Sequence, residues 1–94
     1  MGTDMDAAAL ETAQPFDREL IDMMIPHHQG AIRMAHMELA DGANVDVKRL
    51  AEAIVDAQSK ELEQMNAWRV DWFGAMSPAG GVPAEEDHGS GHGI

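Results

Sequence analysis

Apolar positions recur at helical spacing in two long stretches of the chain, and no stretch shows the apolar–polar alternation of a strand. The first stretch runs from about Pro15 to Ala40, and Pro15 suits the first position of a helix. The second runs from about Val45 to Phe73, with Asn44 or Asp46 as its N-cap. Because only a short turn separates the stretches, the pattern predicts an all-α protein built on a long antiparallel helical hairpin.

Shorter segments surround the predicted hairpin. The alanine-rich stretch Thr3–Gln14 predicts a short N-terminal helix. The first long helix is expected to end with Gly42 as a left-handed cap, and to kink or loosen at Pro26, where an amide hydrogen bond is missing. Glycine and proline are frequent in residues 77–94, which are therefore predicted to form a flexible acidic tail behind a helical domain of residues 1–76.

Helical phase places two histidines on an apolar face. At about 100° per residue, His27 and His28 fall within a wide apolar arc, whereas His36 falls with Gln29 on the opposite, solvated side. The apolar arc is expected to contain Phe16, Leu20, Met23, Met24, Ala31, Met34 and Ala35. On the second long helix, the apolar stripe is expected to contain Val47, Leu50, Ile54, Met65, Trp68 and Trp72. So wide an arc suits contact with more than one helix.

Two polar residues, Gln58 and Glu61, interrupt the apolar stripe of the second helix, where an unpartnered buried polar group costs about 1–3 kcal/mol. Counted from the turn, His28 comes level with Gln58, and Met24 faces the neighbourhood of Glu61. The hairpin is therefore predicted to bring polar side chains and a methionine together in one cluster, with two further methionines one or two helical turns away. The cluster contains Met24, His27, His28, Gln58 and Glu61, and the more distant sulfurs are those of Met34 and Met65.

Imidazole and thioether groups without any cysteine favour copper, because imidazole binds several transition metals while thioether sulfur selects soft copper(I). Copper(II) stays open as an alternative oxidation state. The candidate metal ligands are His27, His28, Met23, Met24, Met34, Met37 and Met65. Further ligands, or residues that orient the histidines, are expected among Asp17, Gln58, Glu61 and His36. The acidic tail adds two weak candidates, His88 and His92.

The two adjacent histidines are expected to serve different clusters. Their side chains diverge by about 100°, so they cannot chelate one ion side by side without distortion. His27 is expected to join Met23 and Met34, and His28 to join Met24, with a partner subunit able to supply further ligands. An ordinary interpretation stands beside this one, since methionine also fills cores and a buried histidine often only makes hydrogen bonds.

Composition narrows the class of protein. The 94 residues carry a formal charge of -11, which argues against a nucleic-acid-binding surface. The absence of cysteine excludes disulfides and thiolate metal sites, and eight methionines call for an explanation. No apolar run approaches the roughly 18 residues of a membrane span. No signal peptide opens the sequence shown.

The run FDRELIDMMIPHHQGAIRMAH and the later run LAEAIVDAQSKELEQMNAW resemble the bacterial family known as "domain of unknown function 305". The matching residues are Asp17, Met24, Pro26, His27, His28, Ala31, Met34, Gln58, Glu61, Met65 and Trp68. The resemblance implies a ferritin-like four-helix bundle and, for members with known roles, copper binding and copper tolerance in the periplasm, outside the cell or at its surface. Many relatives carry two such hairpins, so the single hairpin here implies a homodimer.

These observations favour a copper-binding protein that sequesters or buffers copper, without a catalytic role. A ferritin-like di-metal oxidase is one alternative, but its usual Glu-x-x-His motif is absent from the long helices and occurs only at Glu85 and His88 of the tail. A metal-free helical interaction module is the other alternative, with structural histidines. Specific copper binding should raise the melting temperature, whereas a metal-free module should not respond.

Overall fold

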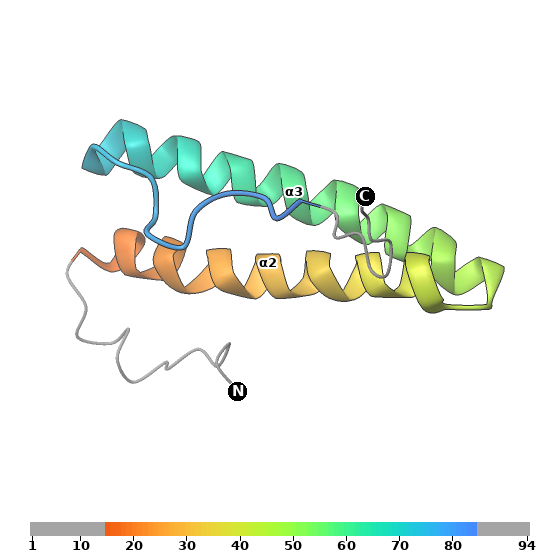
Figure 1. The fold of residues 1–94 in the computed structure, drawn as a ribbon. Helices are drawn as coiled ribbons and strands as arrows, with labels where there is room; N and C mark the ends of the chain where they lie inside the picture. The colour runs from red at the N-terminus through yellow and green to blue at the C-terminus, as the bar shows by residue number, and fades with distance from the viewer. Residues whose placement is uncertain (1–14, 85–94) are drawn as a thin grey trace.

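The computed structural model describes residues 15–84, in which two long helices lie side by side and run in opposite directions (Figure 1). Helix α2 spans Phe16–Asp41 and helix α3 spans Val45–Phe73, and the described residues contain no strand. The predicted all-α hairpin is thus confirmed. The short helix predicted over Thr3–Gln14 and the histidines at positions 88 and 92 lie outside the described residues.

The ends of α3 have clear local causes. The side chain of Asn44 accepts hydrogen bonds from the backbone amides of Asp46 at 2.8 Å and Val47 at 3.1 Å. These amides have no partner within the helix, so Asn44 rather than Asp46 is the N-cap. The helix ends at Gly74, whose φ of 91° is left-handed and whose amide donates to the carbonyl of Val70.

One expectation about α2 was wrong. Gly42 follows the helix in an extended conformation, with φ of -74°, rather than as a left-handed cap. Glycine is required there for a steric reason, because a Cβ atom would lie 2.6 Å from the carbonyl oxygen of Glu38 and overlap its side chain. Pro26 lies inside the helix, and a kink or loosening at this residue stays a prediction.

The hairpin is held by a small core. Ile21, Ile25 and Ile32 of α2 pack with Leu62 of α3, and half-buried Met65 lies against them. Ile25, Ile32 and Leu62 are fully buried. This core occupies one stripe of each helix, as expected for two helices that bury a common seam.

The buried stripe of α2 is not the one that the sequence pattern predicts. Ile32 marks its centre, about 140° around the helix from His27. His27 is consequently exposed, and the Met34 side chain is 67% exposed. The apolar arc predicted for α2 includes residues of the buried core and residues of the exposed surface next to it. Its centre therefore lies between the core and that surface.

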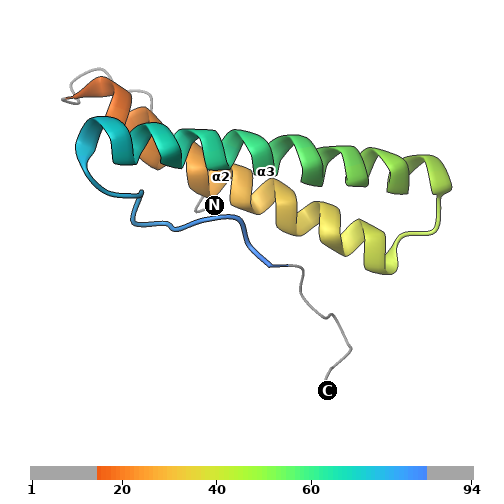
Figure 2. The same ribbon diagram turned by 90° about the horizontal axis from the view of Figure 1, so that it is seen from above.

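A C-terminal strap, residues 74–84, folds back from the end of α3 and runs along the hairpin (Figures 1 and 2). Buried side-chain amides hold its backbone: Gln29 donates to two strap carbonyls, while Asn66 donates to one and accepts from one strap amide. The strap partners are the carbonyls of Ala79, Gly81 and Gly80 and the amide of Ser77, all at 2.8–2.9 Å. The segment 77–81 is therefore held by hydrogen bonds to both helices, although its composition predicts a flexible tail.

The strap explains why another prediction about α2 was wrong. The helical pattern places Gln29 and His36 on the solvated side, yet both are buried. Gln29 is polar because it binds strap carbonyls, and not because it faces water. His36 lies two turns further along the same side, and its Nδ1 atom has no hydrogen-bond partner within the described part of the chain.

Asp22 and Arg69 join the two helices beside the strap. Arg69 Nε donates to Asp22 Oδ1 at 2.6 Å and Nη2 donates to Oδ2 at 3.0 Å, while Nη1 reaches the strap carbonyl of Ala75 at 2.7 Å. Burial by itself would raise the pKa of Asp22, but the hydrogen bonds and charge of Arg69 outweigh it and hold that pKa below its ordinary value.

Replacing Asp22 with asparagine should lower the free energy of unfolding at neutral pH by about 1.5–3 kcal/mol, the usual worth of hydrogen bonds to a charged group. Because the folded-state pKa is lowered, this stabilisation is complete above the ordinary value of 3.8 and is lost as the pH falls through the folded value. Urea unfolding at pH 7 and at successively lower pH should show the wild type and Asp22→Asn converging in acid. Asp56→Asn, which removes an exposed pair with Lys60, is the control and should cost at most about 0.5 kcal/mol.

Candidate metal centre

His28 is the best-positioned candidate ligand. It is buried on α2, and its Nδ1 atom lies 2.9 Å from the carbonyl oxygen of Met24, one turn earlier. A carbonyl only accepts, so Nδ1 carries the hydrogen. The other nitrogen, Nε2, points across the hairpin and lies 2.8 Å from Glu61 Oε1 of α3.

This geometry leaves the His28 Nε2 atom in need of a positive partner. A neutral imidazole has one N–H, and donating it to Met24 turns the Nε2 lone pair toward the Glu61 carboxylate. A proton or a metal cation between these two acceptors would satisfy both. Metal-binding histidines commonly fix their orientation in this way, by donating the second ring N–H to a backbone carbonyl.

Two methionines border the same space. An open hollow of about 480 Å³ lies beside His28, and we call it the His28 hollow. Its lining residues are Met24, His28, Lys60, Glu61, Gln64, Met65 and Trp68. The structure therefore brings Met24, His28 and Glu61 together as predicted, and it brings Met65 closer than the residue count from the turn indicates. Neutral nitrogen, carboxylate oxygen and two thioether sulfurs are all available here.

His27 belongs to a different surface, as its adjacency to His28 predicts. The two rings are 6.2 Å apart between centroids and inclined by 64°. His27 lines a separate hollow of about 240 Å³, the His27 hollow, with Gly30, Ala31 and Met34. Because both His27 and Met34 are exposed, this pair offers ligands to an ion only at the surface or in contact with another molecule.

The other candidates are scattered. Met23 is half-buried and Met37 is exposed, and neither lines the His27 or the His28 hollow. Asp17 lies near the start of α2, beside a further hollow whose lining also includes Leu20, Ile21, Trp68 and Trp72. Gln58 is half-buried, and its Oε1 atom finds no partner in the range 15–84. His36 lies on the strap side, away from these residues.

The donor set is small and soft. Within residues 15–84, no three side chains among histidine, aspartate, glutamate and cysteine come together as a metal-binding group. His28 and Glu61 form only a pair, and thioethers supply the remaining donors in the hollow. Such a set suits a soft ion with few ligands rather than a hard or octahedral one.

Trp68 was missed as a site residue by the sequence reasoning, which placed it in the apolar stripe and among the family-matching residues but not among the candidate ligands. It borders the His28 hollow together with Met65 and Glu61. The spacing contains the signal, because Trp68 follows Glu61 by two helical turns and Met65 by three residues, and so shares their face.

A family model matches residues 1–69 and carries the description "Domain of unknown function (DUF305)". The chain belongs to this family. The match contains all of α2 and α3 up to Arg69, including every residue of the His28 hollow, while the strap of this DUF305 chain lies beyond it. No curated protein and no solved structure matched the chain. Among the described residues, neither helix is long and apolar enough to cross a membrane.

Proposed function

We propose that this DUF305 protein binds copper(I) in the His28 hollow and thereby sequesters or buffers copper. The observation that supports this proposal is the fixed orientation of His28: Nδ1 is hydrogen-bonded to its own helix, and Nε2 faces a carboxylate beside two methionines. His28 Nε2, Met24 and Met65 are the proposed ligands, and Glu61 supplies a compensating negative charge.

The donor chemistry favours copper(I) over other metals. Thioether sulfur binds soft copper(I) and adds little for hard cations, and imidazole nitrogen is compatible with it. A di-iron oxidase would instead need several inward carboxylates and paired Glu-x-x-His motifs. The described part of the chain gathers no group of three such ligands, so its geometry gives the oxidase alternative no support.

The proposal places the protein outside the cytoplasm, in a periplasm, in the medium or at a cell surface, where holding copper would contribute to tolerance. The support is chemical. Oxidising compartments turn paired thiols into disulfides, and this chain has no cysteine. A histidine and methionine site keeps its soft ligands under those conditions.

His28→Ala should lower copper(I) affinity by more than about 100-fold, because loss of residues that merely orient a ligand already costs about 10–100-fold. Met24→Leu and Met65→Leu remove one sulfur each at nearly constant volume, so each should weaken binding without disturbing the fold. Anaerobic competition with a chromophoric copper(I) chelator measures these affinities. Met37→Leu is the matched control, because exposed Met37 lies nine residues beyond His28, about 14 Å along α2.

The outcomes separate copper binding from the metal-free alternative. Copper(I) should also raise the melting temperature of the wild type, since it binds the folded state alone. Unchanged melting together with equal chelator competition by the wild type and His28→Ala would contradict the proposal. Equal losses in Met37→Leu and Met24→Leu would show that copper binds methionines without a specific site.

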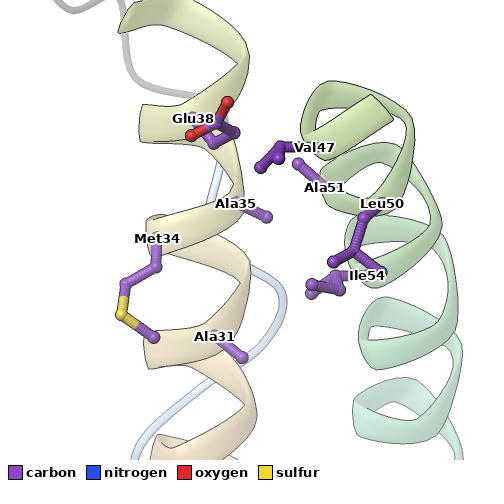
Figure 3. Close-up of a pocket in the computed structure, with 8 residues that line it drawn as sticks. All are labelled: Ala31, Met34, Ala35, Glu38, Val47, Leu50, Ala51 and Ile54. Carbon is purple, nitrogen blue, oxygen red and sulfur yellow. The ribbon is translucent and has the colours of Figure 1, made fainter. Parts of the chain in front are cut away.

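We further propose that two hairpins pair into a ferritin-like four-helix bundle. The strap covers one side of the hairpin, while the opposite side, which we call the open face, exposes large apolar side chains. These include Phe16, Leu20, Met34, Val47, Leu50, Trp68 and Trp72. Near the turn, Val47, Ala51 and Ile54 extend from α3 toward Ala31 and Ala35 of α2, and a hollow of about 180 Å³ lies between them (Figure 3).

A second copy of the chain fits this open face best. The buried core of the described hairpin contains only four large apolar residues, while many others stay exposed, a pattern typical of a small domain that is stabilised by a partner. The two helices have similar lengths, 26 and 29 residues, so an identical hairpin can cover the whole face and form the bundle. In such a dimer, the exposed His27 and Met34 would lie near the partner.

A further inference from the structure

The indole rings of Trp68 and Trp72 form a stacked pair near the end of α3. Their centroids are 5.5 Å apart, and their planes differ by only 6°. The two residues are one helical turn apart, so Trp72 covers the face of Trp68 that looks toward the end of the helix. Trp72 leaves the opposite face of Trp68 uncovered, and Trp68 shares the lining of the His28 hollow with Gln64, Met65 and Glu61.

Trp68 is the residue that separates two hollows. It lines the His28 hollow, and it also lines the outer hollow that contains Trp72, Asp17 and Leu20. Trp72 lines only the outer one. Since Trp72 covers the other face, the free face of the Trp68 indole is the one left to border the His28 hollow, where it offers a π surface in place of a nitrogen, oxygen or sulfur ligand.

We propose that this free face of Trp68 caps the ion in the His28 hollow, so that a bound soft monovalent cation contacts the indole π system. This inference rests on the proposed copper site, because it adds the Trp68 indole as a contact of the same ion. His28, Met24 and Met65 are the proposed ligands, and together with the Glu61 carboxylate beside His28 Nε2 they leave the Trp68 side of the ion without a donor. The electron-rich indole face attracts a cation there.

The cap also accounts for selectivity. An indole face excludes water from the fourth side of the ion, and it offers no lone pair in place of that water. Zinc usually completes a tetrahedron, and copper(II) prefers a square-planar or tetragonal set of nitrogen and oxygen ligands. A site closed by a π face therefore disfavours these ions relative to copper(I) or silver(I).

Stacking on Trp72 makes the cap rigid. An exposed tryptophan turns about two side-chain bonds, but the parallel contact with Trp72 holds the Trp68 ring in one plane. Less ordering is then needed when an ion binds. Trp72 thus acts on the ion through Trp68 and without direct contact, which makes the two tryptophans distinguishable by experiment.

Fluorescence separates the two indoles, because the chain contains only two tryptophans. In Trp72→Phe the emission reports Trp68 alone, and in Trp68→Phe it reports Trp72 alone. Titration with silver(I), a redox-inert soft cation, should change the emission of Trp72→Phe until the site is filled. The emission of Trp68→Phe should change far less. Equal responses from both variants, or no response from Trp72→Phe, would overturn the cap.

Affinity gives the second test. Trp68→Leu keeps an apolar side chain but removes the π face, and should lower copper(I) affinity by about 2- to 30-fold, the range expected for a cation–π contact. Trp72→Leu lies on the same open face, so it controls for effects on pairing between hairpins, and it should lower affinity less. Equal affinity of the wild type and Trp68→Leu would overturn the cap while leaving the copper site intact. Absence of copper binding by the wild type would instead refute the proposed function.

Discussion

Replacing Leu62 with alanine should lower the free energy of unfolding by about 2–5 kcal/mol, which is the cost of a large-to-small change in a packed core. Among the described residues, Leu62 is the one large apolar side chain of α3 that is fully buried in the core. It belongs to the same core cluster as Ile21, Ile25 and Ile32 of α2. No disulfide offsets the loss, since the chain lacks cysteine. For a domain of marginal stability, this change approaches complete unfolding.

Urea denaturation followed by circular dichroism measures this effect. Val70→Ala is the matched control, because Val70 lies on the same helix with its side chain 48% exposed, and its loss should change stability by at most about 0.5 kcal/mol. A Leu62→Ala protein as stable as Val70→Ala would show that the hairpin seam contributes little. The stability would then have to come from the open face, through contact with another molecule.

Replacing Leu50 with glutamate should convert the proposed dimer to a monomer. Leu50 is 58% exposed in the hairpin, so the substitution creates no buried charge in the monomer. In the proposed four-helix bundle, the same residue lies between hairpins beside the hollow near the turn (Figure 3). A dimer would bury two unpaired carboxylates, which is costly, and each chain already carries a formal charge of -11.

Analytical ultracentrifugation across a range of concentrations checks this prediction. The dimer dissociation constant should rise by more than about 100-fold, since about 1.4 kcal/mol corresponds to each tenfold change and a buried unpaired charge costs several times that amount. Val70→Glu provides the control, because Val70 faces away from Leu50 on α3, about 200° around the helix. A monomeric wild type, or a Leu50→Glu protein that stays dimeric, would contradict pairing through the open face.

The strap and the open face give the hairpin two unlike sides. On one side, Gln29, Asn66 and Arg69 bind strap backbone, so that side is closed by the chain itself. The proposed copper site and the proposed dimer surface both belong to the other side. Copper binding and pairing are therefore expected to influence each other, since the His28 hollow lies along the surface that a second hairpin would cover.

Local features of this protein were predictable because they depend on neighbouring residues. Helical spacing predicts both long helices, and a side-chain oxygen at Asn44 suits a cap because free amides follow within three residues. The short turn sets the register of an antiparallel hairpin, so a count of residues from that turn is enough to predict that Met24, His28 and Glu61 lie near one another. The family resemblance was likewise contained in the spacing of these residues, and the family match confirms it.

The tertiary structure alone decided which sides of the helices are buried. The apolar arc of a helix includes every surface that makes apolar contacts. The pattern therefore does not show which part of α2 packs against α3 and which part stays exposed. The actual seam passes through Ile25 and Ile32, which turns His28 inward and leaves His27 at the surface. Gln29 and His36 reverse their expected exposure, Gln29 because a distant strap supplies its partners. Contacts between residues about 50 positions apart leave no pattern in the local sequence, so only the tertiary structure shows them.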